Sequence, residues 1–280
     1  MQERFSYSKI NTFVSCPRKY KIQYIDKISN KFQGIESFMG SVVHMVIYDI
    51  SRKKRHISLD TILDHYDSTW KKMWHNKIMS VVPRQEFNNV NRNHFKKKNK
   101  EKYFLTGKDC IIRFVKSKLY IDLLNNKPSY KKGRKIDVFF EKKIEFVIND
   151  LNFIGIIDRV DIFENEIIIH DYKTNKRLQT VKQLKNNLQF FLYYNAASQL
   201  LNNYNVDKIS ISIFNLLHNS ISGFTYSSND ISKMENSLSK IIANLSSSKY
   251  RPKETPLCNW CYYWKECPIK LTTNPLSVCL

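Results

Sequence analysis

The sequence reads GIIDRVD at residues 155–161 and IIIHDYKT at residues 167–174. Each stretch contains an apolar, β-branched run bounded by polar residues, which is typical of a buried strand. Side chains two positions apart on a strand lie on the same face of the sheet, so Asp171 and Lys173 point the same way. If a turn pairs the two strands, Asp158 approaches Asp171 at one end of the sheet. We therefore expect two carboxylates and an ammonium group to converge there.

A convergence of this kind can support phosphodiester chemistry. Two carboxylates at one sheet edge can hold one or two Mg²⁺ ions, which activate a water and neutralise charge on a phosphate. Lys173 could orient that water or stabilise the transition state. The same spacing also fits a second interpretation, in which Asp158 and Asp161 form turns and Asp171 and Lys173 make a surface ion pair at a strand end.

The composition indicates a folded protein with a polyanionic partner. The 280 residues include 46 Lys and Arg against 25 Asp and Glu, a formal net charge of +21, and 13% are aromatic. The chain is long enough to bury a core and too hydrophobic to be disordered. Basic residues are densest from Arg92 to Lys135, so we expect affinity for nucleic acid at low salt. Alternatively, the lysines only keep the protein soluble.

Targeting signals and membrane segments are absent from the sequence pattern. Residues 1–6 contain no apolar signal core, and no run approaches the roughly 18 apolar residues of a membrane span. We therefore expect an intracellular protein in a reducing compartment, without a membrane segment.

The order of the apolar patterns predicts an α/β fold in one domain, residues 1–280, because no repeat or low-complexity linker divides the chain. Residues 1–135 should be largely helical, residues 136–227 should form a catalytic sheet core, and residues 228–280 should hold a helix and a cysteine-rich end. Strands are expected at residues 136–140, 144–148, 151–157 and 167–172.

Two further segments have distinct patterns. Helical spacing of apolar residues predicts one continuous amphipathic helix over residues 181–204. On it, Gln189 and Tyr193 are four positions apart and therefore neighbours, although such residues alone are ordinary on a helix surface. Residues 83–102 are rich in Asn and Lys and have no apolar period, so we expect a surface loop that faces DNA.

The cysteines give a metal-binding pattern. Cys258, Cys261 and Cys267 form C-x2-C-x5-C, which fits metal ligation better than disulfides in a chain of this length. The candidates for a fourth thiolate are Cys16, Cys110 and Cys279. Four thiolates suit Zn²⁺ and an iron–sulfur cluster equally, and core cysteines with a chance C-x2-C remain an alternative. His44, on an apolar helical stretch, is by itself more typical of a core histidine than of a ligand.

Six motifs in this order resemble the RecB-like nucleases of the PD-(D/E)XK superfamily. The resemblance is strongest to the iron–sulfur branch, which includes the AddB nuclease domain and the CRISPR adaptation nucleases, and it extends from Phe5 to Pro268. The motifs are S-x-I-x-x-F-x-x-C-P-R-K-Y at residues 8–20, G-x-x-x-H at 40–44, an acid at Glu141, G-x-x-D-R-x-D at 155–161, D-Y-K-T at 171–174 and Q-x-x-x-Y at 189–193.

The resemblance implies a restriction-endonuclease-like core, with a central mixed sheet flanked by helices, and a metal-dependent DNA nuclease activity. It implies that His44, Asp158 and Asp171 ligate Mg²⁺ or Mn²⁺ and that Lys173 positions the nucleophilic water. Gln189 and Tyr193 would shape the site or contact the phosphate backbone. Asp161 would then be structural.

The resemblance also selects Cys16 as the fourth thiolate beside Cys258, Cys261 and Cys267. By analogy the group they hold is a structural 4Fe–4S cluster, with Zn²⁺ as the alternative, that staples the two ends of the chain. Closing a loop of this length should stabilise the fold substantially.

The implied substrate is DNA, and we expect an exonuclease that acts on single strands or ends in repair, recombination or replication. Tyr103 and Phe104, beside the basic stretch, could stack on a single strand. The chain has no G-x-x-x-x-G-K-[ST] motif, so any helicase would be a separate protein. The alternative from another class is a catalytically inactive nucleic-acid-binding module stabilised by Zn²⁺ or a cluster. Cleavage polarity and oligomeric state stay open.

Overall fold

The computed structural model describes residues 4–29, 32–125 and 133–280. Residues 126–132 of the predicted basic stretch lie outside the described residues, as do residues 1–3 and 30–31. The chain forms two compact units, each built from three segments. The first unit comprises Met1–Tyr7, Val43–Tyr66 and Lys108–Lys240, and the second comprises Ser8–Val42, Asp67–Gly107 and Ile241–Leu280. The single domain inferred from the sequence stays a prediction.

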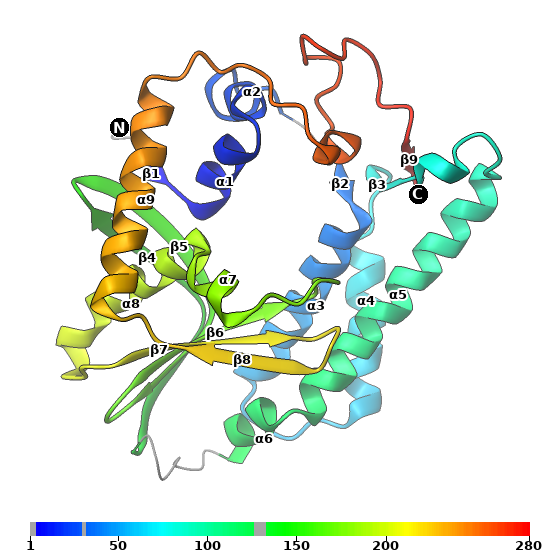
Figure 1. The fold of residues 1–280 in the computed structure, drawn as a ribbon. Helices are drawn as coiled ribbons and strands as arrows, with labels where there is room; N and C mark the ends of the chain where they lie inside the picture. Colours follow the sequence, from blue (N-terminus) through cyan, green and yellow to red (C-terminus); the bar gives the residue numbers. More distant parts are fainter. Residues whose placement is uncertain (1–3, 30–31, 126–132) are drawn as a thin grey trace. The chain divides into compact units, whose positions relative to one another are not determined.

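The first unit contains a six-stranded mixed sheet (Figure 1). Its strands are β1 (Arg4–Phe5), β4 (Lys135–Ile148), β5 (Leu151–Phe163), β6 (Ile167–Lys173), β7 (Ile209–Asn215) and β8 (Ser220–Phe224). The β4–β5, β5–β6 and β7–β8 pairs are antiparallel, while β6–β7 and β1–β5 are parallel. The predicted central mixed sheet is therefore confirmed, although β4 is one strand where the sequence suggested two.

One edge of β5 changes partner along its length. Residues 152–153 pair with β1 and residues 159–162 pair with β6, whereas β4 follows β5 throughout. The ladder between β5 and β6 ends at the Arg159–His170 pair, and Asp158 lies directly beyond it. There the backbone N–H of Tyr172 donates to Asp158 Oδ2 at 2.8 Å. The sheet therefore forks where the two motif strands carry their acidic residues.

The two faces of β6 have different surroundings. Helix α8 (Leu188–Tyr204) packs on β4, β5, β6 and β7, and Lys173 lies on that face, with Nζ 5.7 Å from the ring centroid of Phe190. Tyr172 points to the other face, where its ring packs edge-on against Phe114 at 5.2 Å. Phe114 belongs to α5 (Arg92–Lys116). The alternation expected from the strand period is confirmed.

A buried ion cluster stabilises the middle of the sheet. The guanidinium of Arg159 binds both carboxylate oxygens of Asp161, with distances of 2.6 Å and 2.5 Å, and donates to the Leu119 carbonyl at 3.1 Å. Lys135 Nζ and His170 Nε2 lie 3.0 Å and 3.5 Å from Asp161 Oδ2. Although burial opposes ionisation, Arg159 and His170 hold the pKa of Asp161 well below its usual value. Asp161 is thus a buried structural residue whose carboxylate oxygens are already paired with neighbouring side chains.

The predicted loop at residues 83–102 is wrong from Arg92 onward, where α5 begins. Asn91 caps this helix, because its Oδ1 accepts the His94 N–H at 3.1 Å and its carbonyl accepts the Phe95 N–H at 2.9 Å. An Asn cap stabilises a helix by about 1 kcal/mol, and Lys tolerates helical turns well, so a helix forms without an apolar period. Only a short 3₁₀ turn, Arg84–Glu86, precedes it.

The predicted continuous helix over residues 181–204 is also wrong, because it is interrupted at Asn186 and Asn187. Helix α7 (Val181–Lys185) ends there and α8 begins at Leu188. The Asn187 side chain accepts the Gln189 N–H at 3.0 Å, a local bond that competes with helix continuation. The remaining helices of this part of the chain are α6 (Lys118–Asn125) and α9 (Ser228–Ser246).

The second unit combines short helices with a three-stranded sheet. The sheet contains β2 (Gln33–Gly34), β3 (Ile78–Val81) and β9 (Ser277–Cys279). Its helical elements include α1 (Tyr7–Ser15), α2 (Pro17–Tyr20), a π-helical turn (Lys21–Ile25), α3 (Ile35–Arg52), α4 (Leu59–Met73) and two 3₁₀ turns (Arg84–Glu86 and Pro256–Trp260). Helices α1, α3, α4, α5 and α9 each have residues in both units.

The aromatic core of this unit uses residues that were expected to bind DNA. Tyr103 is 5% exposed, and its hydroxyl donates to Glu36 at 2.6 Å. Phe104 packs edge-on against Trp70 at 5.3 Å, and Trp70 packs against Phe38 at 4.8 Å. The predicted stacking role of Tyr103 and Phe104 is therefore wrong, because their rings face the core. Within the described ranges, no helix is long and apolar enough to cross a membrane.

Candidate functional site

The first unit brings together all six residues that the sequence proposed for the catalytic site. They are His44 on α3, Asp158 on β5, Asp171 and Lys173 on β6, and Gln189 and Tyr193 on α8. We call this set the carboxylate–lysine site. It lies at the fork in the sheet, on the face covered by α8.

Lys173 and Gln189 form the hydrogen-bonded centre of this site. Lys173 Nζ lies 3.0 Å and 2.9 Å from the two oxygens of Asp171 and donates to Gln189 Oε1 at 3.1 Å. Gln189 Nε2 donates to Asp171 Oδ1 at 3.2 Å and to the Tyr193 hydroxyl oxygen at 2.9 Å. Burial opposes the charge on Lys173, but Asp171 raises its pKa above the ordinary value. Lys173 is therefore an ammonium ion at neutral pH.

The two aspartates have different electrostatic environments. Burial and the neighbouring Asp158 raise the pKa of Asp171 to about 6, against the opposing effect of Lys173. Burial also disfavours charge on Asp158, but His44 and the Tyr172 N–H hold its pKa below the ordinary value. Asp171 Oδ2 is buried, and it lies 2.9 Å from the ammonium of Lys173, with which it forms an ion pair. A buried carboxylate oxygen is suited to coordinating a cation.

A group of potential metal ligands lies around Asp158. Ligand atoms of His44, Glu141 and Asp158 all lie within 4.8 Å of one another, and His44 Nδ1 is 3.4 Å from Asp158 Oδ1. Burial opposes a positive charge on His44, but Asp158 raises the pKa of His44 to about 9. The protonated His44 ring therefore neutralises the carboxylate charge that a bound metal cation would neutralise. One nitrogen and several carboxylate oxygens fit Mg²⁺ or Mn²⁺. Asp171 is not in this close group, and its carboxylate contacts Lys173 and Gln189.

Glu141 reaches this group through an unusual backbone conformation. It has a φ of 46° in the middle of β4, a left-handed conformation that typically costs about 1–3 kcal/mol for such a residue and is concentrated at functional sites. Its neighbours Phe140 and Lys142 pair with Arg159 and Ile157, so Glu141 lies opposite Asp158. In the sequence, the charged residues 141–143 separate the two strands that were expected at residues 136–140 and 144–148. In the structure they lie within the single strand β4, and Glu141 has the irregular conformation.

Tyr7 is a further side chain near the site that no sequence pattern marked. Burial raises the pKa of its phenol, and the charges of Lys173 and Asp171 act on it in opposite directions. The Asn187 side chain forms a hydrogen bond with the Tyr7 hydroxyl. Tyr7 follows β1 by two residues, so the pairing of β1 with β5 places it here.

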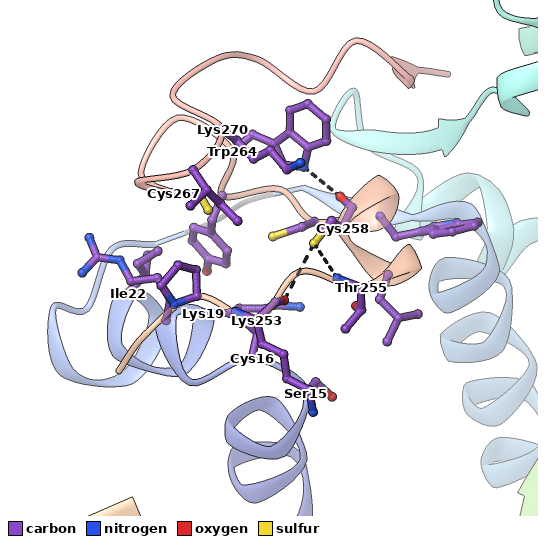
Figure 2. A pocket seen from close by; sticks show the side chains of 17 residues that line it. Ser15, Cys16, Lys19, Ile22, Lys253, Thr255, Cys258, Trp264, Cys267 and Lys270 are labelled. Atoms are coloured by element: carbon purple, nitrogen blue, oxygen red, sulfur yellow. Dashed lines mark hydrogen bonds between the residues drawn. The ribbon is translucent and has the colours of Figure 1, made fainter. Parts of the chain in front are cut away.

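The four predicted cluster cysteines lie together in the second unit. Cys16, Cys258, Cys261 and Cys267 line one cavity of about 200 Å³ (Figure 2). The Lys253 N–H donates to Cys16 Sγ and the Thr255 N–H donates to Cys258 Sγ, both at 3.5 Å. Backbone N–H groups directed at sulfur are typical of thiolate-bound metal centres.

The two remaining cysteines do not line this cavity. Cys110 is fully buried in α5, and burial raises the pKa of its thiol to about 12. It therefore behaves as a small core residue. Cys279 is exposed on β9.

Comparisons with known proteins agree with the geometry. Residues 4–268 match the family model described as the PD-(D/E)XK nuclease superfamily. A crystal structure of a "Putative exonuclease" from Eubacterium rectale is similar with 12% identity and a TM-score of 0.48, over 92% of this chain and 87% of that chain. No curated protein matches the sequence.

Proposed function

Because the chain belongs to the PD-(D/E)XK nuclease superfamily, we propose that it hydrolyses DNA phosphodiester bonds with the help of Mg²⁺ or Mn²⁺. The observation that carries this proposal is the convergence of Asp158, Asp171 and Lys173 at the sheet fork, where Lys173 contacts both oxygens of the buried Asp171 carboxylate. A DNA-binding module without catalysis has no need for that set. The net charge of +21 agrees with a polyanionic substrate.

The cation would be held by His44, Glu141, Asp158 and Asp171. When bound, it would lower the pKa of a water and neutralise charge on the scissile phosphate. The ammonium of Lys173 would orient the attacking water and stabilise the developing negative charge, because Asp171 and Gln189 fix its position.

Tyr193 would donate a hydrogen bond to the DNA backbone. Its oxygen already accepts a hydrogen bond from Gln189 Nε2, which leaves its own hydrogen for an external acceptor. Burial raises the pKa of the phenol well above its usual value, so the hydroxyl stays protonated. Gln189 would thus orient both Lys173 and Tyr193.

We further propose that Cys16, Cys258, Cys261 and Cys267 hold a structural 4Fe–4S cluster, as in the iron–sulfur branch of the superfamily. Four thiolates around one Zn²⁺ would be about 3.8 Å apart, from tetrahedral Zn–S bonds of about 2.3 Å. Both a single Zn²⁺ and a cluster therefore need the four sulfur atoms to face one cavity, and all four of these cysteines line the same one.

The form of nuclease that we propose is an exonuclease acting on single-stranded DNA or DNA ends. We expect wild-type protein with Mg²⁺ or Mn²⁺ to shorten single strands progressively and EDTA to stop the reaction. Gel analysis of 5′- and 3′-labelled strands measures this and gives the polarity, and a covalently closed circle is the matched control. Cleavage that persists in EDTA would refute the metal-dependent mechanism, and cleavage of the circle would refute the exonuclease form.

The cluster proposal predicts brown protein after anaerobic purification, with broad absorbance near 400 nm and about four iron atoms per chain. Cys267→Ser should lose the colour and the iron because one of the four ligands is removed. Cys279→Ser is the matched control and should keep both, since Cys279 does not line the cavity. Colourless wild-type protein that contains stoichiometric zinc would contradict the proposal.

A further inference from the structure

A polar cavity of about 420 Å³ lies next to the carboxylate–lysine site in the first unit. Its lining consists of Tyr7, Arg177, Gln179, Gln183, Asn186 and Asn187. Neither an apolar side chain nor a carboxylate belongs to this set. Such a lining disfavours an apolar ligand and a metal cation alike, because neither would find suitable partners.

Two of the lining residues connect the cavity with the catalytic residues. Asn187 Oδ1 accepts the backbone N–H of Gln189 at 3.0 Å, and the Gln189 side chain binds both Lys173 and Asp171. Tyr7 is hydrogen-bonded to Asn187, and its phenol responds to the charges of Lys173 and Asp171. A ligand in the cavity would therefore be adjacent to the group that reacts at Lys173.

The hydrogen-bonding state of the lining favours acceptor ligands. Gln183 Oε1 accepts the Thr180 N–H at 3.0 Å, so only the NH₂ group of that amide remains for a ligand. The Asn187 carbonyl is likewise occupied by Gln189, and its NH₂ group donates to Tyr7. The Tyr7 oxygen thus accepts one hydrogen bond and keeps its own hydrogen to donate. Gln183, Asn187 and Tyr7 therefore each direct donors toward a ligand.

Arg177 adds a positive charge to these donors. Its side chain is exposed, and among the described residues it forms no ion pair with a carboxylate. A guanidinium presents up to five N–H donors in a planar fork that matches phosphate oxygens. An anion that only accepts hydrogen bonds is the complementary ligand for this combination.

We propose that this cavity binds the phosphate next to the scissile phosphodiester on the same DNA strand. Arg177 supplies the charge and the Tyr7 hydroxyl supplies a directional hydrogen bond. The inference rests on the proposed nuclease function and adds a second phosphate subsite to it. The phosphate has two sources, an internal diester of the strand or a terminal monoester at its end.

Kinetics of Arg177→Gln test the subsite. We expect the variant to raise KM for a single-stranded oligonucleotide about tenfold and to leave kcat within twofold, because the contact positions substrate and does not touch the reacting atoms. The slope of log affinity against log salt should become shallower by about 1, the value for one lost phosphate contact. Tyr7→Phe should raise KM severalfold. Lys143→Gln is the matched control, since it removes an exposed positive charge that lies beside Glu145.

A second measurement identifies the phosphate. Neutral methylphosphonates are placed one at a time along the oligonucleotide, and strands with a 5′-phosphate, a 3′-phosphate or hydroxyl ends are compared. A methylphosphonate at one position, or removal of the terminal phosphate, should weaken DNA binding by wild type about tenfold. The same change should not weaken DNA binding by Arg177→Gln any further. The position that behaves in this way distinguishes the internal diester from the terminal monoester.

Binding is measured in parallel by fluorescence anisotropy with Ca²⁺ in place of Mg²⁺, so that the two proposals fail separately. A wild type that binds but never cleaves would refute the nuclease function and still report on the subsite. Equal affinities and equal salt slopes for wild type and Arg177→Gln would refute the subsite, whatever the cleavage activity. A methylphosphonate effect that is as large in Arg177→Gln as in wild type would refute it as well.

Discussion

Lys173→Met should lower the single-turnover rate of DNA cleavage about 1,000-fold, the size of effect seen when one preorganised charge-stabilising donor is removed. The ammonium of Lys173 is held by two contacts to Asp171 and one to Gln189. Methionine keeps the length of the side chain and its packing against Phe190 but removes the charge and the donors. The loss should therefore fall on the chemical step, with DNA affinity changed by less than about threefold.

Rapid-quench kinetics with saturating enzyme give the cleavage rate, and anisotropy with Ca²⁺ gives the affinity. Lys143→Met is the matched control, because the Lys143 side chain is 59% exposed and lies 3.6 Å from Glu145 on the surface. It should cleave at the wild-type rate. If Lys173→Met cleaved within tenfold of wild type, Lys173 would have no role in the chemical step.

Asp161→Asn should destabilise the first unit by about 3–5 kcal/mol, the usual cost of removing one partner from a buried ion pair. The carboxylate of Asp161 serves Arg159, Lys135 and His170 at once, and the Arg159 side chain is 1% exposed. An amide cannot neutralise the two cations among them, Arg159 and Lys135. The guanidinium of Arg159 would be left buried without its counter-charge.

Urea unfolding followed by circular dichroism measures the change in the free energy of unfolding. Asp207→Asn is the matched control, since Asp207 is exposed, and it should change stability by less than about 0.5 kcal/mol. A loss below about 1 kcal/mol for Asp161→Asn would mean that the ion cluster is not needed for the fold.

The same cluster gives a pH dependence with a defined sign. The pKa of Asp161 in the folded state is well below its usual value, which is about 3.9 in an unfolded chain. Its contribution to stability is therefore fully present above about pH 4 and is lost as the pH falls through the folded-state pKa. Wild type should lose stability more steeply than Asp161→Asn in that acidic range.

The hairpin of β5 and β6 was predictable because two strong signals coincide there. The β-branched runs set the strands, and the period of two places Asp171 and Lys173 on one face and Tyr172 on the other. The cysteine spacing was equally informative, since C-x2-C brings two thiols together irrespective of the fold around them. Such features depend on short stretches of sequence.

The rest of the site depends on pairings that no short stretch encodes. The fork requires β1, a strand of two residues, to pair with the start of β5. Tyr7 reaches the site only through that pairing, and Glu141 only through a left-handed conformation that its residue type does not favour. Helix α5 forms although its first residues have no helical spacing of apolar side chains, because Asn91 caps its N-terminus. Tertiary pairing and capping decided these positions, and local composition did not.

The short strand β1 affects two places in the structure, the fork in the sheet and the polar cavity. Pairing of Arg4 and Phe5 with Asn152 and Phe153 leaves the edge of β5 open where Asp158 lies. The same pairing carries the chain to Tyr7 at the wall of the polar cavity. We therefore expect a tag, cleavage or sequence change that loosens residues 4–5 to alter the wall of the polar cavity and the spacing of the carboxylates together, although neither residue belongs to the carboxylate–lysine site. Engineering of the chain should therefore leave that strand intact.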